Sequence, residues 1–182
     1  IAGGTKKGRL LRASRTRGLR PTAEKVRAAI FSMIGEKTIQ ARNVLDLYAG
    51  TGAMGIEALS RGAGWVDFVE TNPSLCRDIV KNLEALELSS QGKVHARRVN
   101  QAINELDRDY ELILIDPPYE ADPWVEVMDQ LLESRLLSKG TKVVAEHSSR
   151  RELDERFASL VCQKHRRYGD TAVSIFMLEE NI

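Results

Sequence analysis

Hydrophobic and polar positions recur along this chain with two periods, one typical of helices and one of buried strands. Residues 22–34 carry apolar side chains three and four positions apart, which places them on one face of a helix. Thr22 is placed to cap that helix. From residue 43 onward, short runs rich in Val, Ile and Leu alternate with amphipathic stretches, and this pattern predicts strands that are each followed by a helix.

The units from residue 43 onward define the fold class. We expect strands at residues 43–49, 65–70, 93–99, 110–116, 141–147, 160–169 and 171–179. We expect helices at residues 52–61, 73–88, 101–106, 123–134 and 150–158. Repeated β-then-α units form a parallel sheet covered on both faces, and a tight turn at Gly169-Asp170 makes the last two strands a hairpin. The prediction is an α/β fold: a Rossmann-like, doubly wound, seven-stranded, mostly parallel sheet whose C-terminal hairpin contributes an antiparallel strand.

Length and composition fit one globular domain. The chain has 182 residues, 42% hydrophobic and 29% charged, which is ordinary for a protein with its own core. No apolar run approaches the roughly 18 residues of a membrane span. Cys76 and Cys162 lack CxxC or histidine spacing, so we expect reduced thiols, no metal site and a cytoplasmic location. We divide the chain into a basic N-terminal arm or hairpin, residues 1–21, and a single domain, residues 22–182, with its core at 43–182.

Charge is unevenly distributed, although the net charge is only +1. Residues 1–42 hold eleven Lys and Arg residues against two Glu, a net charge of +9, which leaves −8 for the remainder. The bases of residues 1–21 are Lys6, Lys7, Arg9, Arg12, Arg15, Arg17 and Arg20. Such an arm predicts a polyanionic partner, and the alternative is a solvated tail.

A glycine-rich turn follows the first predicted strand. In DLYAGTGAMG, Gly50, Gly52 and Gly55 have GxGxxG spacing between a strand and a helix, the context that this motif requires. Glycines let backbone N–H groups approach a ligand closely, and the helix N-terminus favours negative charge. Glu70 ends the second strand, where a carboxylate accepts hydrogen bonds from ribose hydroxyls. These residues predict a nucleoside-cofactor site, for a nicotinamide dinucleotide or for S-adenosylmethionine.

Asp46 favours one of these cofactors. It lies four residues before Gly50 in the same strand, aimed at the cleft. A carboxylate would repel a pyrophosphate, whereas it would attract the cationic amino-acid end of S-adenosylmethionine. Asp46 can also pin the glycine loop by accepting backbone N–H bonds, and both roles can hold. We therefore favour S-adenosylmethionine, and Tyr48 of the same loop joins the cofactor-binding set.

In the stretch LILIDPPYE, a predicted buried strand is followed directly by an acid, two prolines and an aromatic residue. Ligands of open α/β sheets bind outside the carboxyl ends of the strands near the order reversal, so we expect Asp116 to face the same cleft as Gly50. Pro117 lacks an N–H, Pro118 stiffens the turn, and Asp116 adds two acceptors, which suits an –NH2 group. Tyr119 offers a face on which a base stacks. The motif indicates methylation of an exocyclic nucleobase amine, helped by in-line positioning and by stabilisation of developing charge.

Together these motifs resemble the class I S-adenosylmethionine-dependent methyltransferases that methylate amines. VLDLYAGTGAMG is similar to their cofactor loop, and DPPY is similar to their catalytic motif. GGTKKGRLL and GLRPTAEKVRAAIFSMI, in this order before the two motifs, resemble more narrowly the bacterial 16S rRNA guanine-N2 methyltransferase family (RsmD type). The match runs from about residue 1 to residue 119, and YGDTAVSIF resembles the closing hairpin of the family.

The resemblance implies roles for the motif residues. The cofactor would be held by Gly50, Gly52 and Glu70, with Asp46 supporting the loop, Asn100 at the end of the third strand near the adenine, and Thr22 at the methionine end. The target base would be held by Asp116, Pro117 and Tyr119.

The resemblance also implies a substrate: 16S rRNA, within a small-subunit assembly particle, bound by a monomer whose basic arm contacts phosphates. The target base would have to leave its stack to reach the cleft. Two alternatives stay open: an adenine-N6 methyltransferase acting on DNA or RNA, and a non-catalytic assembly factor that binds a nucleoside cofactor. A dehydrogenase fits least, because DPPY would then have no role.

Overall fold

The computed structural model describes residues 1–12, 21–118 and 120–179, and the side chains of residues 21–23 lie outside this description. The helices are α1 (Pro21–Ile34), α2 (Ala53–Ser60), α3 (Pro73–Ala85), α4 (Val99–Glu105) and α5 (Trp124–Glu133), with 3-10 turns η1 (Glu36–Thr38) and η2 (Ser89–Gln91). The strands are β1 (Asn43–Leu47), β2 (Trp65–Glu70), β3 (Gly92–Ala96), β4 (Tyr110–Ile115), β5 (Leu137–Ser148), β6 (Arg156–Phe157), β7 (Leu160–Tyr168) and β8 (Thr171–Leu178). Within the described ranges, no helix has the length and apolar character that crossing a membrane requires.

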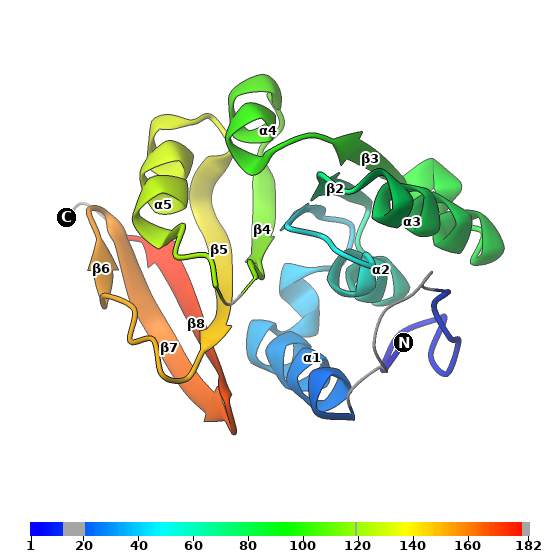
Figure 1. Cartoon of the computed structure of the whole chain (residues 1–182), viewed down its shortest axis with the longest axis horizontal. Helices are drawn as coiled ribbons and strands as arrows, with labels where there is room; N and C mark the ends of the chain where they lie inside the picture. Colours follow the sequence, from blue (N-terminus) through cyan, green and yellow to red (C-terminus); the bar gives the residue numbers. More distant parts are fainter. Residues whose placement is uncertain (13–20, 119, 180–182) are drawn as a thin grey trace.

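These strands form one sheet in the order β3-β2-β1-β4-β5-β8-β7-β6 (Figure 1). β1 to β5 pair in parallel, whereas β8 is antiparallel to both β5 and β7. The predicted doubly wound, mostly parallel sheet is confirmed, but the described sheet has eight strands rather than seven, because the short β6 pairs with the edge of β7. The strand order reverses between β1 and β4, which makes their carboxyl ends the place where ligands bind in open α/β sheets.

The side chains of the strands alternate between two faces, and each face has its own cover of helices. On one face, even-numbered residues such as Val44, Leu112 and Val144 pack with α1, α2 and α3. On the other face, odd-numbered residues such as Leu45 and Ile113 pack with α4 and α5. Because both faces of the central strands are covered, these strands are apolar almost throughout, as is usual for parallel sheets.

The helix predicted for residues 150–158 is wrong. The chain turns after β5 and runs extended until it pairs with β7 as β6. Phe157 is buried with its ring centroid 5.5 Å from that of Phe176, and Leu153 packs against the same core cluster. The four-residue spacing of Leu153 and Phe157 matches one helical turn, but packing at the edge of the sheet buries Phe157 and half-buries Leu153 without a helix.

The first part of the predicted basic arm is docked on α2 and α3 rather than extended. The N–H of Thr5 donates to the carbonyl of Ser60 at 2.7 Å. Arg12 exchanges two backbone hydrogen bonds with the side-chain amide of Asn82, at 2.8 and 2.9 Å. Residues 1–12 are therefore part of the domain surface, and the remainder of the arm lies outside the described residues.

Glu57 of α2 ties this segment to two helices. Its carboxylate is fully buried and accepts hydrogen bonds from the N–H of Ala2 at 2.8 Å and from Arg61 Nε at 2.8 Å. Arg27 Nε of α1 lies 3.4 Å from Glu57 Oε2. A buried carboxylate is tolerated when cations and hydrogen-bond donors surround it in this way, and removing one partner of such a cluster leaves uncompensated charge.

Replacing Glu57 by alanine should lower the free energy of unfolding by about 3 kcal/mol, because the buried guanidinium of Arg27 and the half-buried one of Arg61 would lose their shared carboxylate. Chemical denaturation of the wild type and the variant measures this difference. Glu84→Ala on the exposed face of α3 is the control, with an expected change below about 0.5 kcal/mol. Equal effects of the two substitutions would show that Glu57 does not organise the N-terminal segment.

Candidate active site

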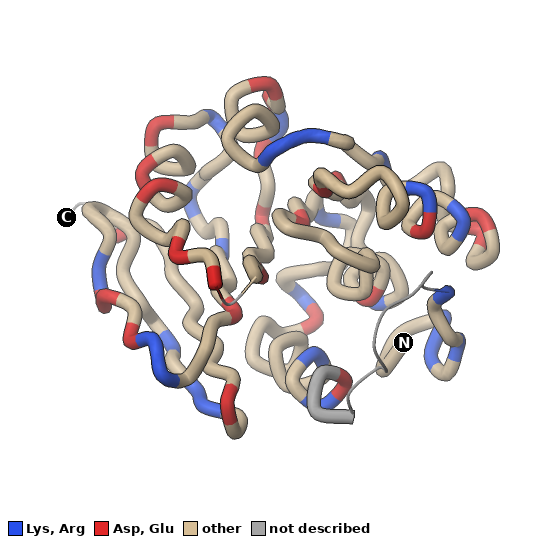
Figure 2. Tube along the Cα trace, in the orientation of Figure 1, with Lys and Arg blue, Asp and Glu red and all other residues tan. Residues whose placement is uncertain are grey.

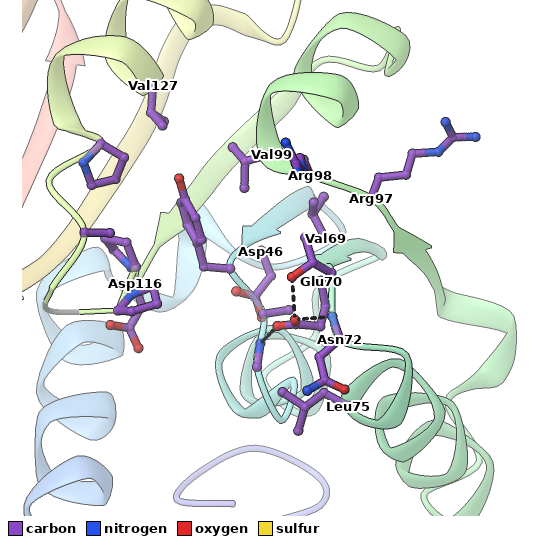
Figure 3. Close-up of a pocket in the computed structure, with 18 of the residues that line it drawn as sticks. Asp46, Val69, Glu70, Asn72, Leu75, Arg97, Arg98, Val99, Asp116 and Val127 are labelled. Atoms are coloured by element: carbon purple, nitrogen blue, oxygen red, sulfur yellow. Dashed lines mark hydrogen bonds between the residues drawn. The ribbon is translucent and has the colours of Figure 1, made fainter.

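A cleft of about 900 Å³ opens at the carboxyl ends of the strands that flank the order reversal. The glycine loop after β1, the end of β2, the first turn of α4, the loop after β4 and the end of β5 all contribute to its lining. Figure 3 shows Asp46 between Glu70 on one side and Asp116 on the other. The topology therefore brings the two motifs of the sequence, the glycine loop and the acid–proline loop, to one cavity.

The glycine loop is shaped by two residues with a left-handed backbone. Gly50 has φ 55° and Gly52 has φ 74°, a region that L side chains rarely adopt. A Cβ at Gly52 would also lie 3.0 Å from a side-chain carbon of Ile79. The N–H of Gly50 donates to Glu70 Oε2 at 2.8 Å, which holds the loop against the end of β2. Tyr48 precedes the loop with φ 60° and lines the cleft.

Gly55 has a different place from the other two glycines. It is buried in α2 and is absent from the lining of the cleft. A Cβ there would lie 2.3 Å from the ring of Phe68, so the close packing of α2 on β2 requires glycine. The N–H of Gly55 donates to Asp46 Oδ2 at 2.8 Å. Asp46 therefore pins the start of α2 and lines the cleft as well, so the two roles considered for it do not exclude each other.

Four carboxylates reach the cleft from four neighbouring strands. Asp46, Glu70, Asp116 and Glu146 occupy the carboxyl ends of β1, β2, β4 and β5, and all four line the cavity. Side chains alternate along a strand, so each of these acids points to the same face of the sheet as Val44, Leu112 and Val144. This is the face that α1, α2 and α3 cover. The parallel pairing of β4 with β5 reaches Ile115–Ala145, and Asp116 and Glu146 are the residues that directly follow this pair.

Burial and mutual repulsion change the acidity of three of these groups. Desolvation raises the pKa of Asp46 to about 7, against the hydrogen bond from Gly55 and with help from the nearby Asp116. Asp116 is exposed to the open cleft, but the protein packed around it raises its pKa to about 6. Desolvation and the charge of Asp116 raise the pKa of Glu146 to about 8, partly offset by Arg27. Near neutral pH these carboxyl groups of the cleft therefore remain partly protonated, whereas exposed carboxyl groups would be ionised.

The loop after β4 presents acceptors to the cleft. Asp116, Pro117 and Pro118 all line it, and Pro117 is buried. Because the two prolines have no N–H, the loop offers the Asp116 carboxylate and backbone carbonyl groups. Tyr119 lies outside the described residues.

The remaining predicted cofactor residues have mixed outcomes. Asn100 lines the cleft from the first turn of α4, because β3 ends at Ala96 and not at residue 99; its predicted place at the end of a strand is corrected. The side chain of Thr22 lies outside the description. The sequence analysis did not single out Glu146 or Arg98, which also line the cleft. The strand alternation of TKVVAEH was the signal for Glu146, since it places Glu146 on the same face as Val144.

Basic positions lie along the N-terminal segment, the connection from β3 to α4, and the β7–β8 hairpin (Figure 2). Lys7 and Arg9 are exposed, and Lys6 lies 3.8 Å from Glu87 of the α3–β3 connection. Arg12 is exposed, while its backbone is fixed to α3. The predicted positions Arg15, Arg17 and Arg20 lie outside the described residues.

Comparison with known proteins identifies the family. Residues 1–177 match the family model described as "Conserved hypothetical protein 95". The chain belongs to this family. It is 36% identical to "Putative rRNA methyltransferase YlbH" of Bacillus subtilis over 179 residues, which cover 97% of each chain. It is 26% identical to "Ribosomal RNA small subunit methyltransferase D" of Escherichia coli strain K12, over 98% of this chain and 89% of the relative. These relatives agree with the resemblance that the motifs indicated.

Solved structures agree with the fold. The solved structure titled "Putative methyltransferase yhhF" from Escherichia coli superposes on this protein with a TM-score of 0.88 at 23% identity, covering 100% of this chain and 98% of the other. A conserved hypothetical protein of Streptococcus pyogenes superposes with a TM-score of 0.79 at 32% identity, covering 84% of this chain and 95% of the other. The arrangement of strands around the cleft is therefore shared with other members of this structural group.

Replacing Asp46 by asparagine should change how stability depends on pH. The pKa of Asp46 is 3.8 in its ordinary state and about 7 in the folded protein, so folding retains a proton between these values and the stability of the wild type falls as pH rises through them. Asparagine keeps an acceptor for Gly55 and does not titrate. Relative to the wild type, the variant should gain up to about 4 kcal/mol between pH 4 and pH 8.

Denaturant titrations at several pH values measure this gain. Asp129→Asn on the exposed face of α5 is the control, and its curve should run parallel to that of the wild type. A parallel curve for Asp46→Asn would contradict the placement of Asp46 as a buried, proton-retaining group.

Proposed function

We propose that this protein transfers a methyl group from S-adenosylmethionine to the exocyclic N2 amine of a guanine in 16S rRNA. The observation that carries the proposal is the acceptor loop of Asp116, Pro117 and Pro118, which opens into the same cleft as the glycine loop of Gly50 and Gly52. Membership of a family with rRNA methyltransferases among its relatives supports rRNA as the substrate. We propose further that the substrate is a small-subunit assembly particle in the cytoplasm and that the enzyme acts as a monomer.

The residues of the cleft fit S-adenosylmethionine better than a dinucleotide. Two carboxylates accept hydrogen bonds from the glycine loop and the start of α2, those of Glu70 and Asp46, and they would repel a pyrophosphate and attract a cationic ligand. We assign Glu70 to the ribose hydroxyls, Gly50 and Gly52 to close backbone approach, and Asn100 to the adenine. Asp46, Tyr48 and Gly55 shape the loop, and Thr22 is assigned to the methionine end.

The chemistry that we assign to this chain is mainly positioning. When bound, S-adenosylmethionine supplies an electrophilic methyl group. The Asp116 carboxylate and a loop carbonyl accept hydrogen bonds from the two hydrogens of the amine, which favours a pyramidal nitrogen whose lone pair points at the electrophile. Negative charge at Asp116 stabilises the positive charge that develops on that nitrogen. Asp116 then accepts the proton that the methylated amine releases, and its raised pKa suits this task.

The identity of the methylated nucleoside tests the proposal. Purified protein is incubated with methyl-labelled S-adenosylmethionine and, separately, with naked 16S rRNA, 30S particles and DNA, and the digested products are separated by chromatography and mass spectrometry. N2-methylguanosine from the 30S particles is the expected product. N6-methyladenine would instead support the adenine alternative, and binding without transfer to any substrate would support a non-catalytic assembly factor.

In the same assay, Asp116→Asn should lower the methylation rate by at least about 100-fold, because removing one stabilising group of the transition state commonly costs this much. Binding of S-adenosylmethionine, measured by calorimetry, should stay within about threefold of the wild type. Glu70→Gln is the converse variant, and we expect it to weaken cofactor binding first. Equal loss of binding and transfer in Asp116→Asn would show a structural role instead.

The basic N-terminal segment is proposed to contact RNA phosphates. Replacing Lys7 and Arg9, both exposed, by glutamine should weaken binding to the 30S particle and lower the slope of log affinity against log salt by about two, one for each lost contact. Filter binding at several salt concentrations measures the slope. Arg135 is exposed between α5 and β5, and the control Arg135→Gln should leave the slope unchanged. An unchanged slope in the double variant would remove the segment from the RNA interface.

A further inference from the structure

Glu146 is a carboxylate of the cleft to which neither motif of the sequence assigns a role. It lies near the carboxyl end of β5, beside Asp116 just after β4, because each directly follows one member of the parallel pair Ile115–Ala145. It is half-buried and lines the same cavity as Asp116. On the side of α1, the guanidinium of Arg27 is close enough to favour its charged form. Two carboxylates on adjacent strands thus face one ligand position.

This pair matches the hydrogen-bonding edge of guanine. Guanine carries the N2 amine and, next to it, an N1–H donor, so two neighbouring acceptors can be satisfied by one base. Adenine presents N1 as an acceptor beside its amine, and an ionised carboxylate would repel that lone pair. We propose that Glu146 accepts the N1–H of the target guanine while Asp116 holds the N2 amine, which makes Glu146 the residue that selects guanine over other amino-purines. This inference rests on the proposed function.

The electrostatics of the cleft favour such a donor-rich ligand. Desolvation raises the pKa of both Asp116 and Glu146, and the charge of Asp116 raises that of Glu146 further. The charged groups that act on Glu146 are Asp116 on the neighbouring strand and Arg27 on α1. Of these, the guanidinium of Arg27 is also engaged by Glu57 at 3.4 Å, so it offsets the repulsion only in part. Two N–H donors from one base would stabilise the ionised forms of both carboxyl groups, because hydrogen bonds to a carboxylate favour its ionised form.

An analogue that keeps the amine and lacks the N1 hydrogen isolates this contact. 2-Aminopurine has the same N2 amine as guanine, but its N1 carries a lone pair. In the wild type we expect kcat/KM for guanine to exceed that for 2-aminopurine by at least about 100-fold, as is typical when a buried charged acceptor loses its donor. Glu146→Gln places an amide there, which can donate to N1 or accept from it. The preference should therefore fall below about tenfold.

The substrate for this test is 16S rRNA joined from two pieces, with guanine or 2-aminopurine at the position that the wild-type enzyme methylates, assembled into 30S particles. Methyl transfer is measured for the wild type, Glu146→Gln and Glu126→Gln. Glu126 of α5 also lines the cleft, and its replacement removes the same charge from a different side of it. The control should keep the preference of the wild type. The shift in melting temperature caused by S-adenosylmethionine checks that each variant is folded.

The outcomes separate the two proposals. A wild-type enzyme that methylates guanine and 2-aminopurine equally overturns the inference whatever the variants do. The inference is also overturned if Glu146→Gln keeps a 100-fold preference for guanine. A wild-type enzyme that forms no N2-methylguanosine at all overturns the proposed function and the inference together. A collapsed preference in Glu146→Gln alone, with the control unchanged, supports Glu146 as the guanine-selecting residue.

Discussion

The parallel register of β1, β2, β4 and β5 is the constraint on which the cleft depends. Parallel strands of one sheet bring their carboxyl ends to the same edge, and side chains two residues apart in a strand point to the same side. Four acids at or near these carboxyl ends therefore converge on the cleft, although they are far apart in the chain: Asp46, Glu70, Asp116 and Glu146. The order reversal between β1 and β4 leaves the space above them uncovered by a crossover helix. Burial raises the pKa of Asp46, Asp116 and Glu146, and the charge of Asp116 adds to the shift at Asp46 and at Glu146.

The scaffold and the cleft share one cation. Arg27 of α1 is buried, lies 3.4 Å from Glu57 of α2 and also favours the charged form of Glu146. Glu57 in turn holds the N–H of Ala2. The guanidinium group of Arg27 consequently connects three features: the docking of the N-terminal segment, the packing of α1 on the sheet and the charge balance of the cleft. The chemistry proposed for the base-binding side of the cleft depends on this packing, although neither Arg27 nor Glu57 belongs to a recognisable motif.

Local patterns in the sequence predicted most of the fold. The apolar runs around Val44, Phe68 and Ile113 have the length and composition of buried strands, and each is buried in the structure. The helix at residues 150–158 failed because Leu153 and Phe157 satisfy a helical spacing as well as an extended one, and only the neighbouring edge of β7 decides between them. Asn100 was placed in a strand because no local signal marks where β3 gives way to α4.

By itself, the sequence determined the order of the elements, the two motifs and their chemistry, because strand periodicity, glycine spacing and the Asp-Pro-Pro loop are properties of neighbouring residues. Tertiary structure decided which residues share the cleft. Gly55 was predicted to bind the ligand, but in the structure it packs α2 against Phe68. Asp46 both pins the start of α2 and lines the cleft. Glu146 lies beside Asp116 through the pairing of β4 with β5. The physical reason is that side chains from different strands meet only through sheet register and helix packing, which depend on contacts between residues distant in the chain.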